Sequence, residues 1–108
     1  MGAAVEVKNS IIMRGSKIPH HNYVGDSVIG EDCNLGAGTK IANLRLDKRK
    51  IEINGQETDR YKLGAILGDQ VKSGINASIN VGSFIGNGSL IGPGALVSGT
   101  LLPNSIVF

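Results

Sequence analysis

Both histidines of this 108-residue chain fall in one irregular stretch, residues 16–26, and they are its first candidates for chemistry. Adjacent residues of an extended chain point to opposite sides, so His20 and His21 form a poor metal chelate. A zinc site needs further ligands, and the chain has no third histidine. An imidazole titrates near neutral pH, so one of the two is suited to act as a general base on an amine. The alternative is an exposed histidine at a bend of the chain with no chemical role.

A six-residue repeat must position these side chains. From Leu67 to Leu102, the first position of each six is aliphatic in five of six cases, and the second is glycine in four of six. The fifth position is Ala, Ser or Val in five of six cases. The pattern also occurs earlier in the chain, with a step of only five residues between its third and fourth aliphatic positions. These earlier positions are Ile12, Ile18, Val24, Ile29, Leu35 and Ile41.

Neither the helical period nor the strand period produces this pattern. Each six is interpreted as a short strand followed by a corner, with the aliphatic side chain pointing inward and the small fifth residue at the corner. Three corners close a triangular coil whose turns stack in parallel. The fold class is therefore all-β, a parallel β-helix of hexapeptide repeats. Cys33 falls on a fifth position, which favours a small buried hydrophobe over a reactive thiol.

The repeat fails from about residue 43 to residue 62, and we expect an arm over about 44–64 that projects from the coil. Asn54-Gly55 within it predicts a hairpin turn. Six of the eleven cations of the chain lie in the arm, interrupted by acids. This mixture favours a solvated loop over a nucleic-acid patch. The arm is either a tolerated insertion or a segment that reaches over the site of a neighbouring subunit.

The length of the chain predicts a single domain over residues 1–108. So short a chain makes a small core, and association between subunits is one way to compensate for it. A lone cysteine, the lack of a signal peptide and the lack of a long apolar run predict a soluble, cytoplasmic protein.

The residues around the histidines resemble a known family. The chain is similar to the acetyltransferase domain of the bifunctional enzyme that makes UDP-N-acetylglucosamine, in which a glucosamine-1-phosphate N-acetyltransferase is fused to a nucleotidyltransferase. It resembles archaeal versions in particular. The similarity extends without gaps from Val5 to Asn43 and continues as repeat from Ile66. Its anchors are Glu6, Lys8, Ser16-Lys17, His20, Tyr23, Gly25-Asp26, Ile29-Gly30, Asn34, Gly36-Ala37-Gly38-Thr39 and Asn43.

The resemblance implies a left-handed coil, which departs from the usual right-handed crossover. It also implies acetyl transfer from acetyl-CoA to the amine of glucosamine 1-phosphate or galactosamine 1-phosphate, in UDP-N-acetylhexosamine synthesis and without a metal. His20 would be the general base, and Asn43 would orient the amine or the acetyl group. The sugar phosphate would be bound by Lys8, Tyr23 and Asn34. Acetyl-CoA would be bound by Ala37, Asn43, Leu44, Ile75 and Pro93.

The resemblance further implies a homotrimer with its sites between subunits, and no nucleic-acid or membrane partner. The fused nucleotidyltransferase domain is expected to lie outside this chain. Two of the expected acetyl-CoA positions depart from the family pattern, because Ile75 stands where serine is common and Pro93 where alanine is common. Proline has no N–H to donate. A lysine that the family supplies to the neighbouring site falls near Arg49.

Two other functions compete with acetyl transfer. The chain could be a non-catalytic assembly domain that trimerises a sugar-1-phosphate nucleotidyltransferase. An ice-binding solenoid would need a ladder of threonines, and the chain contains only Thr39, Thr58 and Thr100. That third function is therefore set aside.

Overall fold

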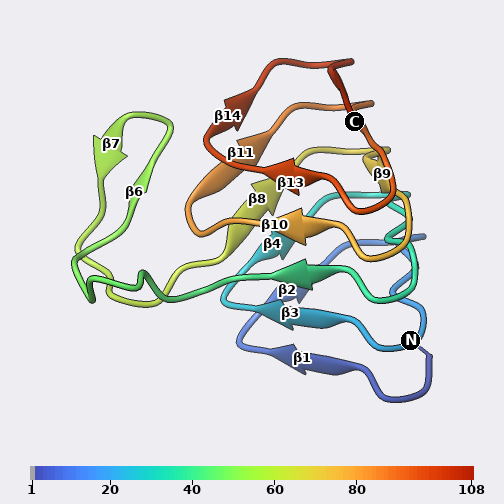
Figure 1. The fold of residues 1–108 in the computed structure, drawn as a ribbon, viewed down its shortest axis with the longest axis horizontal. Helices are drawn as coiled ribbons and strands as arrows, with labels where there is room; N and C mark the ends of the chain where they lie inside the picture. Colours follow the sequence, from blue (N-terminus) through green and yellow to red (C-terminus); the bar gives the residue numbers. More distant parts are fainter. Residues whose placement is uncertain (1) are drawn as a thin grey trace.

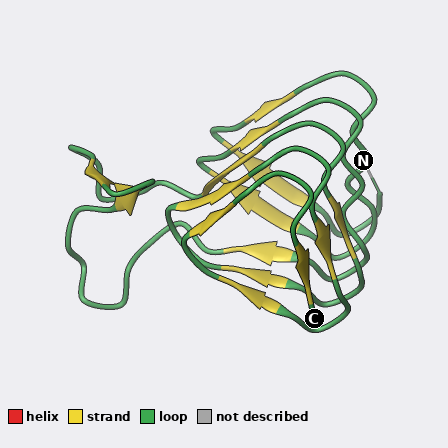
Figure 2. Ribbon diagram, turned by 90° about the horizontal axis from the view of Figure 1, so that it is seen from above, coloured by secondary structure: helices red, strands yellow, loops and turns green. Residues whose placement is uncertain are grey.

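The chain winds into a coil of triangular cross-section from which one hairpin projects (Figures 1 and 2). The computed structural model describes residues 2–108, and every regular element in that range is a β-strand. Accordingly, no helix able to cross a membrane occurs among these residues.

Three parallel sheets form the sides of the coil, and we call them faces A, B and C. Face A contains β1 (Glu6–Lys8), β3 (Tyr23–Gly25), β5 (Lys40–Ile41), β10 (Ser78–Ile79) and β13 (Leu96–Val97). Face B contains β2 (Ile11–Ile12), β4 (Val28–Ile29), β8 (Ala65–Leu67), β11 (Ser83–Ile85) and β14 (Thr100–Leu101). Face C contains β9 (Lys72–Ser73), β12 (Leu90–Ile91) and β15 (Ile106–Val107), and isolated bridges extend it to Asn34 and Lys17. The turns between faces are called corners AB, BC and CA.

The predicted left-handed winding is confirmed. In Figure 1 the strands of face A run from right to left at the front, and those of face B return behind them as the chain climbs. This hand departs from the rule for parallel crossovers, which describes longer connections that pack a helix onto a sheet. Here the connection between neighbouring strands of one face is a turn of the coil through the other two faces, with no helix packed on the sheet in residues 2–108, so that packing argument does not apply.

The core is a stack of thin aliphatic layers. The first-position residues of the repeat point inward, and the small fifth-position residues close the corners beside them. Cys33 is buried as predicted, and its Sγ lies 3.1 Å from the carbonyl oxygen of Gly68. The fully buried aliphatic side chains include Ile18, Val24, Ile29, Leu35, Ile41, Leu67, Ile79, Ile85 and Val97.

One predicted repeat is wrong. The sequence pattern placed Leu101 in the small fifth position of a six that began at Val97. The structure pairs Leu101 with Ile85 on face B, so Leu101 occupies an inward aliphatic position. The last corner AB is therefore shortened to Ser98-Gly99, because the chain has no residues there to complete a full six.

The arm leaves and re-enters the coil at corner AB. Its base is closed by an antiparallel bridge between Leu44 and Lys62 and by a 3.0 Å hydrogen bond from Leu63 N–H to the Asn43 carbonyl. The predicted hairpin is present, with β6 (Glu52–Ile53) antiparallel to β7 (Gln56–Glu57). Asn54 and Gly55 both have positive φ, of 51° and 76°, as a two-residue type I′ turn requires.

Candidate active site

Corner CA stacks four of the predicted site residues in one column. Gly38 N–H donates to the His20 carbonyl at 3.1 Å, and the same bond recurs from Asn76 to Ala37 and from Gly94 to Ile75. His20, Ala37, Ile75 and Pro93 therefore hold equivalent positions in successive turns of the coil. Neighbouring strands of a sheet are about 4.8 Å apart, so the column is an edge along which an extended ligand can lie.

Asn22 holds the backbone on both sides of His20. It is buried, and its Nδ2 donates to the carbonyls of Pro19 at 2.9 Å, His20 at 3.2 Å and Gly36 at 3.2 Å. Its Oδ1 is buried without a hydrogen-bond partner among residues 2–108. The His20 side chain itself is exposed to solvent.

The reason given above for dismissing a histidine chelate is wrong. The chain is not extended here, because His21 has a φ of 58° in a turn, and the two rings lie 6.4 Å apart between centroids. Residues 2–108 contain no group of three or more His, Cys, Asp or Glu side chains placed to hold an ion.

Corner AB joins two further predicted residues through their side chains. Asn43 Nδ2 donates to Tyr23 Oη at 3.0 Å and to Asp26 Oδ2 at 2.8 Å. Lys8 lies beside this cluster, because it pairs in register with Gly25 and its carbonyl accepts a 2.9 Å bond from Asp26 N–H. The cluster draws on three successive passages of the chain through one corner.

Asp26 is the member of this cluster that the sequence analysis did not assign. The residue is 8% exposed and its φ is 52°, a conformation that aspartate and asparagine tolerate better than most residues. The only sequence signal for it was its place in the Gly25-Asp26 anchor.

A shallow groove lies on the outside of face A. It has a volume of about 270 Å³, and Tyr23 lies at one end of it. Lys40, Ser78 and Leu96 follow Tyr23 in register along the outside of face A. The groove therefore runs along the axis of the coil on the outside of face A, and Tyr23 is the one member of the Asn43 cluster that lines it.

Asn34 lies apart from the other predicted sugar-phosphate residues. It bridges Lys17 and Lys72 on face C, whereas Tyr23 lies on face A and Lys8 at the end of β1. Within one chain, the predicted site is thus divided into two groups. One group consists of His20 at corner CA and Asn34 on face C, and the other surrounds corner AB with Lys8, Tyr23 and Asn43.

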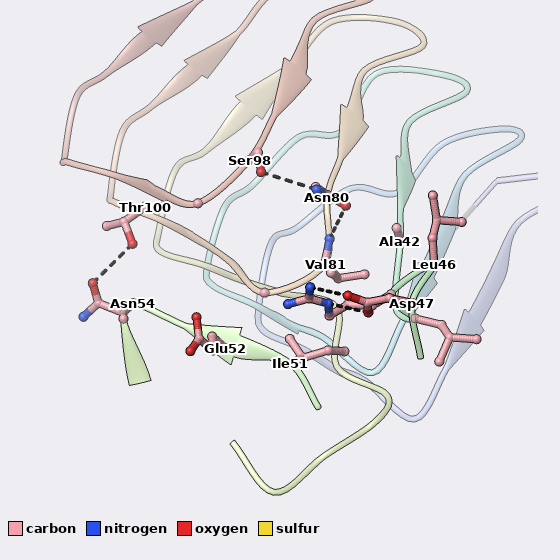
Figure 3. A pocket seen from close by; sticks show the side chains of 15 residues that line it. Ala42, Leu46, Asp47, Ile51, Glu52, Asn54, Asn80, Val81, Ser98 and Thr100 are labelled. Atoms are coloured by element: carbon pink, nitrogen blue, oxygen red, sulfur yellow. Dashed lines mark hydrogen bonds and ion pairs between the residues drawn. The ribbon is translucent and has the colours of Figure 1, made fainter. Parts of the chain in front are cut away.

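Leu44 lines a cavity of about 650 Å³ between the arm and the coil (Figure 3). The cavity lies away from the Ala37 column, so Leu44 is not grouped with the other predicted acetyl-CoA residues within one chain. Its walls are linked by a hydrogen bond of 3.2 Å from Thr100 Oγ1 to Asn54 Oδ1. Asn80 and Val81 line its coil side, and Figure 3 shows the Asn80 side chain bonded to Ser98 and to the Val81 N–H.

The charges of the arm are exposed and partly paired with one another, as a solvated loop predicts. Arg45 forms a bidentate pair with Asp47, which lowers the pKa of the Asp47 carboxyl and raises that of Arg45. The Lys50 ammonium pairs with Asp59, and this hydrogen bond raises the pKa of Lys50. Arg49 lines a second cavity on the arm, of about 610 Å³.

Comparisons with known proteins identify the family of the chain. Residues 1–80 match the family model of the GMPPB C-terminal domain. A bifunctional sugar-1-phosphate nucleotidylyltransferase/acetyltransferase of Sulfurisphaera tokodaii is 56% identical over 90 residues, which are 80% of this chain and 22% of that protein. The bifunctional protein GlmU of Methanocaldococcus jannaschii is 45% identical over 112 residues, which are 100% of this chain and 27% of that protein. The resemblance seen in the sequence, including its archaeal character, is therefore confirmed.

A solved structure supports the fold alone. The hexapeptide-repeat containing acetyltransferase of Vibrio cholerae matches 98% of this chain and 66% of its own with a TM-score of 0.51, at 19% sequence identity. The chain spans only about a quarter of the length of the curated relatives it matches.

Proposed function

Because the chain belongs to the family of the GMPPB C-terminal domain and is similar to bifunctional GlmU proteins, we propose that it is an N-acetyltransferase. The proposed acceptor is the amine of glucosamine 1-phosphate or galactosamine 1-phosphate, and the proposed donor is acetyl-CoA. The observation that carries the proposal is the column at corner CA, in which His20 is aligned with the three positions expected to contact acetyl-CoA.

In the proposed reaction, the sugar nitrogen attacks the thioester carbonyl carbon while the His20 imidazole takes a proton from that nitrogen. A C–N bond forms, and the carbonyl opens to a tetrahedral oxyanion. The intermediate collapses with cleavage of the C–S bond, and the proton held by His20 passes to the departing CoA thiolate. No covalent enzyme intermediate is needed in this reaction. Most of the rate enhancement comes from holding the two substrates in attack geometry.

The division of the site supports a homotrimer. His20 and Asn43 occupy different corners of the triangular coil, so one chain does not bring them onto a single substrate. A threefold assembly can set corner CA of one subunit against corner AB of its neighbour. In that arrangement the amide of Asn43 meets the amine near His20, and the ammonium of Lys8 meets the sugar phosphate.

A second candidate function is assembly without catalysis, and face B favours it. The outward side chains of this face form an apolar column in register, and Ile11 within it is 60% exposed. Burial of such a column between copies of the chain would stabilise an oligomer whether or not the site is active. The column consists of Ile11, Val28, Ile66 and Phe84.

The direct test is release of thiol from acetyl-CoA in the presence of each sugar phosphate. His20→Ala is expected to reduce kcat by about 10²–10⁴-fold, the usual contribution of a general base. His21→Asn is the matched control, because it removes the neighbouring exposed imidazole, suits the positive φ of 58° at this position and is expected to leave kcat unchanged. Equal activity of His20→Ala and the parent chain, with the oligomer intact by size-exclusion chromatography, would contradict the proposed role of His20.

The two candidate functions are distinguished by binding. Acetyl-CoA is expected to raise the melting temperature of the oligomer, because a ligand that binds only the native state stabilises it. An oligomer that neither binds acetyl-CoA nor releases thiol would instead identify the chain as an assembly domain.

A further inference from the structure

We propose that Asp26 is a positioning residue, which fixes the amide of Asn43 so that only its carbonyl oxygen is available to a substrate. This inference rests on the proposed acetyl transfer for its chemical meaning. The orientation of the amide, however, follows from the structure of corner AB and can be measured without any turnover.

The contacts of Asn43 leave one orientation of its amide. An ionised carboxylate only accepts hydrogen bonds, so the atom of Asn43 that lies 2.8 Å from Asp26 Oδ2 must be the nitrogen. The amide nitrogen carries two hydrogens, and the second is directed to Tyr23 Oη at 3.0 Å. Both donors of Asn43 are thus committed within the corner, and its Oδ1 remains as the free polar atom.

This orientation selects between the two roles that the sequence left open for Asn43. A carbonyl oxygen accepts a hydrogen bond from the N–H of a sugar amine, but it cannot donate one to the oxygen of a thioester. Asn43 is therefore assigned to the amine and not to polarisation of the acetyl carbonyl. Tyr23 is complementary, because its oxygen accepts from Asn43 and its own hydroxyl hydrogen is left to donate to an acceptor such as a phosphate oxygen.

Asp26 is itself held firmly enough to impose this orientation. Its N–H donates to the Lys8 carbonyl at 2.9 Å, and its carbonyl accepts from Gly64 N–H at 2.8 Å. The residue therefore ties the preceding turn of the coil to the point where the arm returns. Because Asp26 is only 8% exposed as a residue, water has little access to compete for its bond to Asn43.

Two substitutions at this site separate positioning from folding. Asp26→Gly removes the carboxylate and accepts the positive φ of 52° without strain. Asp26→Asn also suits that backbone and keeps an oxygen that can accept from Asn43, although it removes the charge. Asp32→Gly is the matched control, because Asp32 has a φ of 55° at corner BC and its side chain is exposed.

The kinetic readout is the split between kcat and KM for acetyl-CoA. Asp26→Gly is expected to lower kcat by about 10–100-fold, since misplacement of a positioned group by about 1 Å has effects of this order. The KM for acetyl-CoA should stay within about twofold, because Asn43 is assigned to the amine. Asp26→Asn should recover most of the lost kcat, and Asp32→Gly should match the parent chain. A parent-like kcat in Asp26→Gly would overturn the positioning role.

Nuclear magnetic resonance of the Asn43 side-chain amide tests the same inference without activity. The resonance can be assigned from its loss in Asn43→Ala. Its hydrogens should exchange slowly with water in the parent chain and in Asp32→Gly, and at least tenfold faster in Asp26→Gly. Unchanged exchange in Asp26→Gly would overturn the inference even if the protein were active. Faster exchange in a chain with no acetyl transfer would support the orientation by Asp26 and contradict only the proposed function.

Discussion

Corners CA and AB hold their candidate catalytic groups in opposite ways. At corner CA, the His20 imidazole has no hydrogen-bond partner among the described residues, and Asn22 secures only the backbone around it. At corner AB, the Asn43 amide is itself secured by Tyr23 and Asp26. Corner CA fixes the backbone of His20 but not its imidazole, whereas corner AB fixes the side-chain amide of Asn43 itself.

The difference matches the two tasks assigned to these residues. A base must gain and lose a proton, and a fixed charged partner would displace its pKa from neutrality. An acceptor for an amine keeps one state throughout the reaction, so a fixed orientation reduces the entropy lost on reaching the transition state. Each of the following predictions concerns a substitution at one corner, and they are ordered from the largest expected effect to the smallest.

Gly25→Ala should displace the side chains of Tyr23 and Asn43 at corner AB without replacing either residue. A Cβ at this position would lie 2.5 Å from Tyr23 Oη and 2.8 Å from Asn43 Nδ2, so both groups must move. Gly25 does not have a positive φ, so its backbone accepts alanine. We expect kcat/KM for the sugar phosphate to fall by about 100-fold, the scale of a small misplacement in a catalytic site. Steady-state kinetics check this, and parent-like values would show that the cluster takes no part in catalysis.

Asn22→Thr should loosen corner CA while preserving its fold. The next turn of the coil has Thr39 at the equivalent position, where its Oγ1 donates to the Gly36 carbonyl at 2.8 Å. A threonine at position 22 can make the corresponding bond to Pro19, but it loses the bond to the His20 carbonyl and removes the unpaired Oδ1. We expect kcat to fall by roughly tenfold, a fraction of the effect of a 1 Å misplacement. Stability should change by about 1 kcal/mol or less, because a lost hydrogen bond and a removed unpaired group offset each other.

Urea denaturation and steady-state kinetics on the same samples decide this second prediction. Ser89→Ala is the control, because Ser89 makes the same kind of corner bond, to the Gly86 carbonyl at 2.9 Å, far along the coil from His20. It should lose about 1 kcal/mol of stability with kcat unchanged. A kcat that fell equally in both variants would attribute the effect to general loosening of the coil.

Cys33→Ala at corner BC should change the free energy of unfolding and leave the kinetics of the reaction unaffected. Burial raises the pKa of the Cys33 thiol, so the folded state holds that proton more tightly than the unfolded state does. The resulting stability is fully present below the unfolded pKa of about 8.5 and is lost as the pH rises through the folded value. The parent chain should therefore lose more unfolding free energy than Cys33→Ala as the pH rises above about 8.5. Equal pH profiles for the two would show that Cys33 does not contribute.

The sequence predicted the coil well because its signal is local. Each six-residue unit contains its own aliphatic and small positions, and burial of Ile29, Ile79 and Ile85 follows from that pattern alone. The prediction failed at Leu101 because a fixed period cannot reveal a shortened corner, whereas pairing with Ile85 can.

The candidate site was predictable only in part, because its contacts join residues that are distant in the chain. The motif indicated Tyr23 and Asn43, but nothing in it showed that their side chains share Asp26. The turn at His21 was also missed, since its positive φ has no sequence signal comparable to that of Asn54-Gly55.

Because the base of the arm is closed, corner AB is a site at which the coil can accept an inserted segment. Leu44 and Lys62 are bridged, and β5 and β10 on either side pair directly, with Ile41 opposite Ile79. The coil therefore keeps its phase whatever length of chain is inserted between them. Segments of different size or chemistry can be exchanged at this joint while the layers above and below retain their order, so the scaffold and its appendage are free to diversify separately.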